Sequence, residues 1–138
     1  MSIKDVCFLC LLLLGACSGA LAQDSLRIYR LLDSVHQLPP DTAKASLLID
    51  MGRANARYFD AHKIENPFWQ EALSLSQELK FKKGASLVYN EIGTSKRNKS
   101  LYIMAEDFHE KALKAAEEAN DTFLIIFSLN NAGVDCRR

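Results

Sequence analysis

The feature of this sequence that most constrains its fold is a repeat of about forty residues. Gly93 recurs forty positions later as Gly133, and Gly52 lies forty-one positions before Gly93. The same interval relates the apolar positions Phe68, Ala72, Leu75 and Leu79 to Phe108, Ala112, Ala115 and Ala119. Self-similarity at such a period is typical of solenoids, whose units bury their apolar faces only against their neighbours. The repeat therefore predicts an interaction scaffold, not an enzyme.

The charge balance excludes one class of partner. The chain has 138 residues, enough for one domain with a sizeable core, and its 17 basic and 17 acidic residues cancel. A nucleic-acid-binding domain is expected to be basic. We therefore expect no nucleic acid among its partners.

The first 22 residues have the pattern of an export signal. Lys4 supplies a positive charge, and the uncharged apolar run from Val6 to Leu14 is too short for a comfortable membrane-spanning helix. Ala20-Leu21-Ala22 then provides an A-x-A cleavage site before Gln23. This reading predicts an exported protein of the periplasm or cell envelope.

The same segment also fits a second processing route. Leu14-Gly15-Ala16-Cys17 resembles a bacterial lipobox, in which the cysteine is lipidated and becomes the new N-terminus. Cleavage after Ala22 would release the protein, whereas lipidation of Cys17 would tether it to a membrane. Both routes remain open from the sequence.

The expected processing determines which cysteines remain in the mature chain. Cys7 and Cys10 form a C-x-x-C pair inside the signal and would be removed with it. Cleavage after Ala22 leaves only Cys136, which cannot form an internal disulfide. Its helical spacing from Leu129 and Ala132 predicts a small buried side chain.

Apolar spacings of three and four residues predict helices throughout the mature chain. A leading helical segment, 23–40, ends at Pro39-Pro40, because proline removes an amide donor and clashes with the preceding turn. Asp41 or Thr42 can cap the next helix, and Pro67 suits a first turn. The expected repeat helices are 41–60, 68–80, 84–97, 101–119 and 123–138, grouped into units 41–82, 83–122 and the incomplete 123–138.

The second unit resembles a tetratricopeptide repeat. The stretch from Ala105 to Leu113 is similar to that family's second helix, and Gly93 lies 12 positions before Ala105, as the family pattern requires. The stretch from Ser128 to Gly133 resembles the variant with forty residues per repeat. Two features depart from the pattern: the proline that ends the usual repeat is absent, and four positions differ, namely Asn55, Glu65, Lys96 and Cys136.

The resemblance covers residues 41–138 and implies an all-α superhelix of helical hairpins. It would hold two full repeats and one unpaired last helix. The family binds partners on the concave face lined by each first helix. Carried over to this chain, that face predicts protein or peptide contacts from Asn90, Thr94, Arg97, Asn130 and Arg137.

No pattern of catalysis or metal binding accompanies the repeat. His36, His62 and His109 have no metal-ligand spacing to other His, Cys or carboxylate residues, and His109 stands at a packing position of the repeat. The sequence also lacks phosphate-loop, dinucleotide and nucleophile motifs. We expect no cofactor, no metal and no enzymatic activity.

The expected function is an exported protein-interaction module. An export signal followed by such repeats resembles the N-terminal sensory part of bacterial histidine kinases and transcription regulators. The alternative is a standalone envelope assembly factor or lipoprotein adaptor. Membrane attachment would come only from a lipid anchor or a downstream segment. The unpaired last helix also predicts marginal stability or self-association, because an exposed apolar face seeks burial.

Overall fold

The computed structural model describes residues 23–137, which are helical and include no strand, so the predicted all-α class is confirmed. These residues divide between Leu38 and Pro39 into two compact units. The first contains one helix, residues 23–36, within the predicted leading segment. The predicted signal peptide with Cys7, Cys10 and Cys17 lies outside the described residues. Within residues 23–137, no helix combines the length and apolar character needed to cross a membrane.

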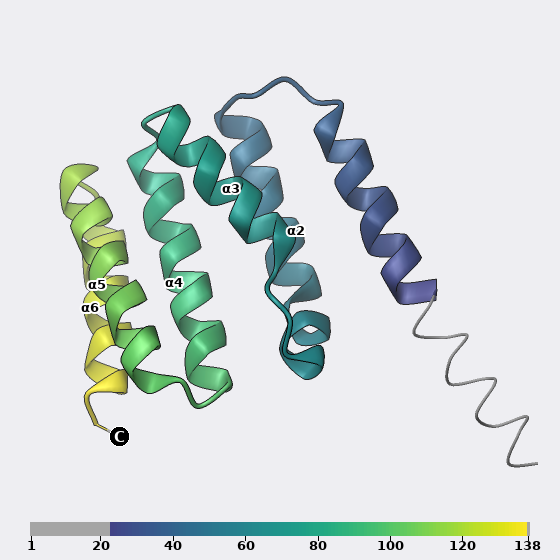
Figure 1. The fold of residues 1–138 in the computed structure, drawn as a ribbon. Helices are drawn as coiled ribbons and strands as arrows, with labels where there is room; N and C mark the ends of the chain where they lie inside the picture. The colour runs from purple at the N-terminus through teal and green to yellow at the C-terminus, as the bar shows by residue number, and fades with distance from the viewer. Residues whose placement is uncertain (1–22, 138) are drawn as a thin grey trace, which may run out of the picture. The chain divides into compact units, whose positions relative to one another are not determined.

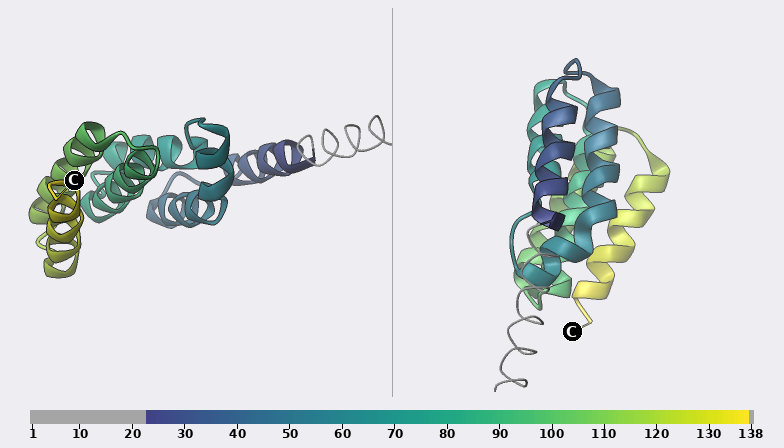
Figure 2. Two further views of the ribbon diagram at one scale, coloured as in Figure 1. Left: turned by 90° about the horizontal axis from the view of Figure 1, so that it is seen from below. Right: turned by 90° about the vertical axis from the view of Figure 1, so that its right-hand side faces the viewer.

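The second unit is a row of antiparallel helices joined by short turns (Figures 1 and 2). Each helix contacts the next along the chain, and α4 also contacts α2 and α6. The helices are α2 (Thr42–His62), α3 (Pro67–Glu78), α4 (Lys82–Asn98), α5 (Tyr102–Glu118) and α6 (Thr122–Asp135). All five lie where the apolar spacing predicted them, with ends that differ by one to three residues.

Side-chain caps fix where three of these helices begin. The Asp41 carboxylate accepts a hydrogen bond from the backbone N–H of Lys44, which decides between the two predicted caps. Asn66 caps α3 by accepting from Phe68 N–H, with Pro67 in the first turn as predicted. Asp121 caps α6. Each cap satisfies an amide that the helix itself leaves without a partner.

The backbone repeats the forty-residue period at the turns that follow α3 and α5. Lys80 and Asn120, forty positions apart, have φ angles of 52° and 54°. Lys63 and Ser100, in the turns after α2 and α4, share this left-handed conformation. Such φ values close helix ends but are costly for side chains with a Cβ, least so for asparagine. The repeat therefore extends from sequence to backbone geometry.

Two of the four positions that differ from the tetratricopeptide pattern, Lys96 and Glu65, form an ion pair with each other. The Lys96 ammonium lies 2.6 Å from the Glu65 carboxylate, although Lys96 is on α4 and Glu65 is in the turn before α3. The Lys96 side chain is only 9% exposed, so the ion pair is partly desolvated. A charged pair thus occupies two of the four positions at which the sequence differs from the tetratricopeptide pattern.

The predicted burial of Cys136 is wrong. The residue follows the last residue of α6 and is exposed, and its thiol donates to the Glu106 carboxylate at 3.5 Å. The thiol lies at the edge of the contact between α6 and α5, where it reaches Glu106 but is not covered. The hydrogen bond and negative charge of Glu106 raise the pKa of the Cys136 thiol. A raised pKa lowers the thiolate fraction and hence the reactivity of the thiol.

Candidate functional site

Asn90, the first of the predicted groove residues, is buried between α4 and α6. It is 1% exposed, and its amide nitrogen donates to the Ser86 carbonyl and to Ser128 Oγ. Its amide oxygen accepts from Asn131 at 3.0 Å. Asn90 was expected on an open concave face, but the direct packing of α4 on α6 buries it against Ser128 and Asn131. The Asn90 amide joins two helices and is not free for a peptide.

Arg97 is engaged in a second buried polar cluster. Its guanidinium lies 3.1 Å from one oxygen of Asp135, and the other oxygen of Asp135 is hydrogen-bonded to Nδ1 of His109. The side chains of Asp135 and His109 are almost fully buried. One carboxylate at the end of α6 thus connects α4 with α5. His109 has the predicted packing role, and the Arg97 guanidinium, predicted to contact a partner, is paired with a carboxylate of its own chain.

The other three predicted residues remain on the surface. Thr94 is half-buried on α4, and Asn130 and Arg137 are exposed on and just after α6. The structure therefore does not gather the five predicted residues into one cluster. Asp135, Ser128 and Asn131, which hold α6 in place, were not predicted.

One face of α4 is covered by the following helix, α5. Ser86 Oγ donates to the Ala112 carbonyl of α5, and the Tyr89 ring lies 6.2 Å from the Phe108 ring. At Gly93, a Cβ would come within 2.5 Å of His109 Nε2. Ser86, Tyr89 and Gly93 therefore form the face of α4 on which α5 packs.

The same arrangement occurs one unit earlier. A Cβ on Gly52 of α2 would come within 2.3 Å of the Trp69 indole of α3, whose nitrogen donates to the Ile49 carbonyl. Each glycine thus makes room for a ring on the helix that follows. The two helices can approach this closely only because the residue at this position is glycine.

Forty positions after the α5-binding face of α4, α6 presents the equivalent residues to solvent. Ser86, Tyr89 and Gly93 correspond to Ile126, Leu129 and Gly133. Ile126 is 63% exposed, Leu129 is 51% exposed, and a Cβ on Gly133 would meet nothing within 4 Å. We call these three residues, with Thr122 and Cys136 at the two ends of the same stripe, the open face of α6.

The open face is apolar and has an apolar flank. Phe123 is 73% exposed and stacks its ring on that of Phe127 at 6.2 Å. The sequence predicted an unpaired last helix with an apolar face, but not that these two phenylalanines extend it. From Thr122 to Val134 the helix carries no charged side chain. Exposed apolar patches of this kind mark sites of protein interaction.

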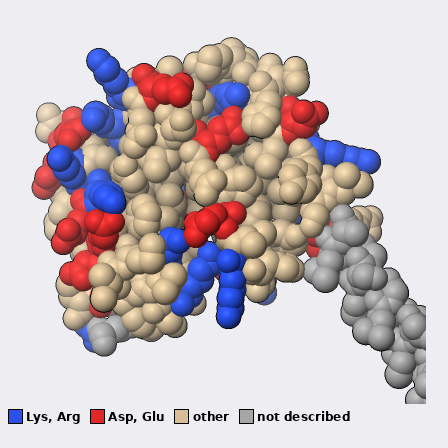
Figure 3. Space-filling model, viewed as in Figure 1, with Lys and Arg blue, Asp and Glu red and all other residues tan. Residues whose placement is uncertain are grey.

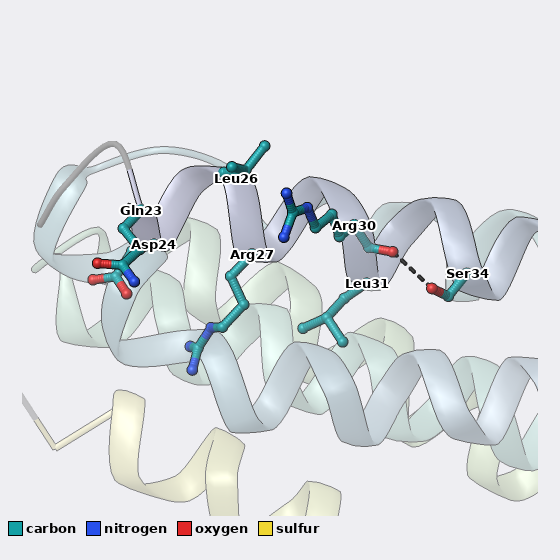
Figure 4. Close-up of a pocket in the computed structure, with 7 residues that line it drawn as sticks. All are labelled: Gln23, Asp24, Leu26, Arg27, Arg30, Leu31 and Ser34. Carbon is teal, nitrogen blue, oxygen red and sulfur yellow. Dashed lines mark hydrogen bonds between the residues drawn. The ribbon is translucent and has the colours of Figure 1, made fainter. Parts of the chain in front are cut away.

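Two surface depressions are weaker candidates. One, of about 450 Å³, lies among the turns after α2 and α4, and its Lys96 and Lys99 are neutralised by Glu65 and Asp60. The other is lined by the leading helix alone, from Gln23 to Ser34 (Figure 4). A single helix offers no opposing wall to enclose a ligand.

Many charged side chains of the second unit are paired with a charge of opposite sign. On the face seen in Figure 3, acidic and basic side chains are interspersed. Several are paired across helices, such as Lys82 with Glu118 and Arg53 with Glu91. Among residues 23–137 no group of three or more His, Cys, Asp or Glu side chains could hold a metal ion. The open face of α6 is therefore the candidate site that stands out by its chemistry.

Compared with protein-family models, with curated proteins and with solved structures, the chain has no match.

Proposed function

We propose that the chain is an exported protein-interaction module built as a tetratricopeptide-type superhelix. The support is the repeated way in which its helices cover one another: Trp69 over Gly52, and His109 over Gly93. These contacts recur at the period of the sequence repeat. On this proposal, residues 1–22 direct export and the chain acts by binding, not by catalysis.

The observation that carries the proposal is the exposure of the open face of α6. Its equivalent on α4 is covered by α5, yet Ile126 and Leu129 are left half-exposed or more. Burial of an apolar side chain of this size stabilises a complex by roughly 1.5–3 kcal/mol when it is complete. A helical face with two such residues is therefore a docking surface for a protein.

A photo-crosslinking experiment in the native cell tests the proposal. A photoreactive phenylalanine analogue replaces Ile126 on the open face or, as the control, the exposed Gln70 of α3. We expect protein adducts from position 126 and none from position 70. Equal yields at the two positions, or none at position 126, would show that the open face has no protein partner in the cell.

A further inference from the structure

We infer that His109 makes the packing of α6 on α4 and α5 sensitive to pH, so that acid releases α6 from the row of helices. Three titratable side chains from three helices meet at this point: Arg97 of α4, His109 of α5 and Asp135 of α6. Their side chains are mostly or fully buried. This control of α6 is independent of which protein the array binds.

The surroundings of His109 assign its proton to Nδ1. That nitrogen faces an oxygen of the Asp135 carboxylate, to which an N–H donates. The other nitrogen, Nε2, is buried and has no hydrogen-bond partner among the described residues. It packs against α4, where a Cβ on Gly93 would lie only 2.5 Å away. The neutral imidazole with a bare Nε2 therefore fits this site.

A second proton on His109 would have to be buried at Nε2. The new N–H would have no acceptor, and an unpaired buried donor costs free energy. The new charge would also lack a counter-charge, because the Asp135 carboxylate already pairs with the Arg97 guanidinium at 3.1 Å. With a neutral imidazole the three side chains sum to zero charge. An imidazolium would leave one uncompensated positive charge in the interior.

The other charged groups around His109 offer no relief. Glu106, one turn earlier on α5, accepts a hydrogen bond from the Cys136 thiol that follows α6. Glu110, the next residue on α5, is exposed. On α4, the Lys96 ammonium adds a further positive charge, which is paired with Glu65. None of these groups provides an acceptor for Nε2.

These contacts set the direction of the pH dependence. When α6 is released, Asp135 no longer holds the ring, so the imidazole can turn toward solvent. A solvated imidazole takes up a proton at about pH 6.5. The packed form therefore binds fewer protons than the released form, and packing weakens as the pH falls below about 6.5. One proton changes this equilibrium by up to about tenfold per pH unit.

Hydrogen exchange in residues 23–138 tests the inference, measured at about pH 7.5 and about pH 5.5 and corrected for intrinsic exchange rates. We expect the protection of α6 relative to α4 to fall by about tenfold in acid. His109→Gln, whose amide can still donate to Asp135 but does not titrate, should remove this pH dependence. The matched control is His62→Gln, because His62 is exposed on α2 and should leave the dependence unchanged.

A second measurement decides the matter if His109→Gln fails to fold. In the wild-type protein, the nitrogen chemical shifts of the His109 ring should show a proton on Nδ1 and none on Nε2 at neutral pH. Protonation of the ring should then accompany the loss of α6 protection. A relative protection of α6 that does not change with pH would overturn the inference. So would a doubly protonated ring while α6 stays protected, or a pH dependence that persists in His109→Gln.

Discussion

The imidazole of His109 occupies the space that a side chain on Gly93 would need: a Cβ at that position would lie 2.5 Å from Nε2. The ring is fully buried, and its other nitrogen is hydrogen-bonded to Asp135. The ring therefore cannot move aside without losing a buried hydrogen bond. This contact joins α4 to α5 and, through Asp135, to α6.

Gly93→Leu should therefore destabilise the fold by about 1–3 kcal/mol, the usual effect of overpacking a core. Urea unfolding followed by circular dichroism measures it. Gly133→Leu is the matched control, since nothing lies within 4 Å of its Cβ position. In dilute protein it should leave the free energy of unfolding unchanged or higher, as leucine favours helix over glycine. Equal losses from both variants would refute the contact.

Lys80→Gly should stabilise the protein by about 1 kcal/mol, because glycine removes the cost of a left-handed conformation at a residue with a Cβ. Lys80 has a φ of 52° in the turn after α3. Lys80→Ala, which keeps the Cβ, should leave the free energy of unfolding nearly unchanged. The melting temperatures of the two variants measure the difference, and an equal gain from alanine would point to the lysine charge instead.

Asp121→Asn should reduce stability at neutral pH but not in acid. The Lys83 ammonium, with the backbone N–H of Leu124, lowers the pKa of Asp121 in the folded protein. A lowered folded-state pKa stabilises the fold above the unfolded pKa, and this contribution is lost as pH falls through the folded pKa. Asparagine keeps the helix cap and removes only the charge. Melting curves from neutral to acidic pH should therefore converge for the two proteins, whereas a gap that persists in acid would exclude the carboxylate as its cause.

The Cys17→Ala variant separates the two export routes. If cleavage follows Ala22, the mature protein begins at Gln23 and its mass does not change with the substitution. If Cys17 is lipidated, the mature protein retains residues 17–22 with acyl chains, and the variant loses its membrane attachment. Intact-mass measurement of the envelope fraction decides between them. Full-length protein in the cytoplasm would reject both.

The sequence predicted the helices well because their apolar spacing and caps are local signals. The Asp41 cap and Pro67 each affect only the first turn of the helix that they begin. Contacts between units were harder to predict. The burial of Asn90 depends on Asn131 and Ser128, which are about forty residues away in sequence.

The side chain that packs against Gly93 could not be predicted from the repeat either. The repeat identified Gly93 as an equivalent of Gly52 and Gly133, but it did not show that the His109 ring fills the space beside it. The exposure of Cys136 was missed because its spacing matches a buried stripe, and burial needs a helix on that side. The period indicates which positions are equivalent, but not which side chain fills the space.

The most direct test of the account is hydrogen exchange of α6 compared with α4 in residues 23–138, measured in dilute protein and repeated after further dilution. The account predicts that in dilute protein the amides of α6 exchange faster than those of α4, because one face of α6 is uncovered. Protection of α6 equal to that of α4 at every dilution would contradict the claim that α6 has an open face.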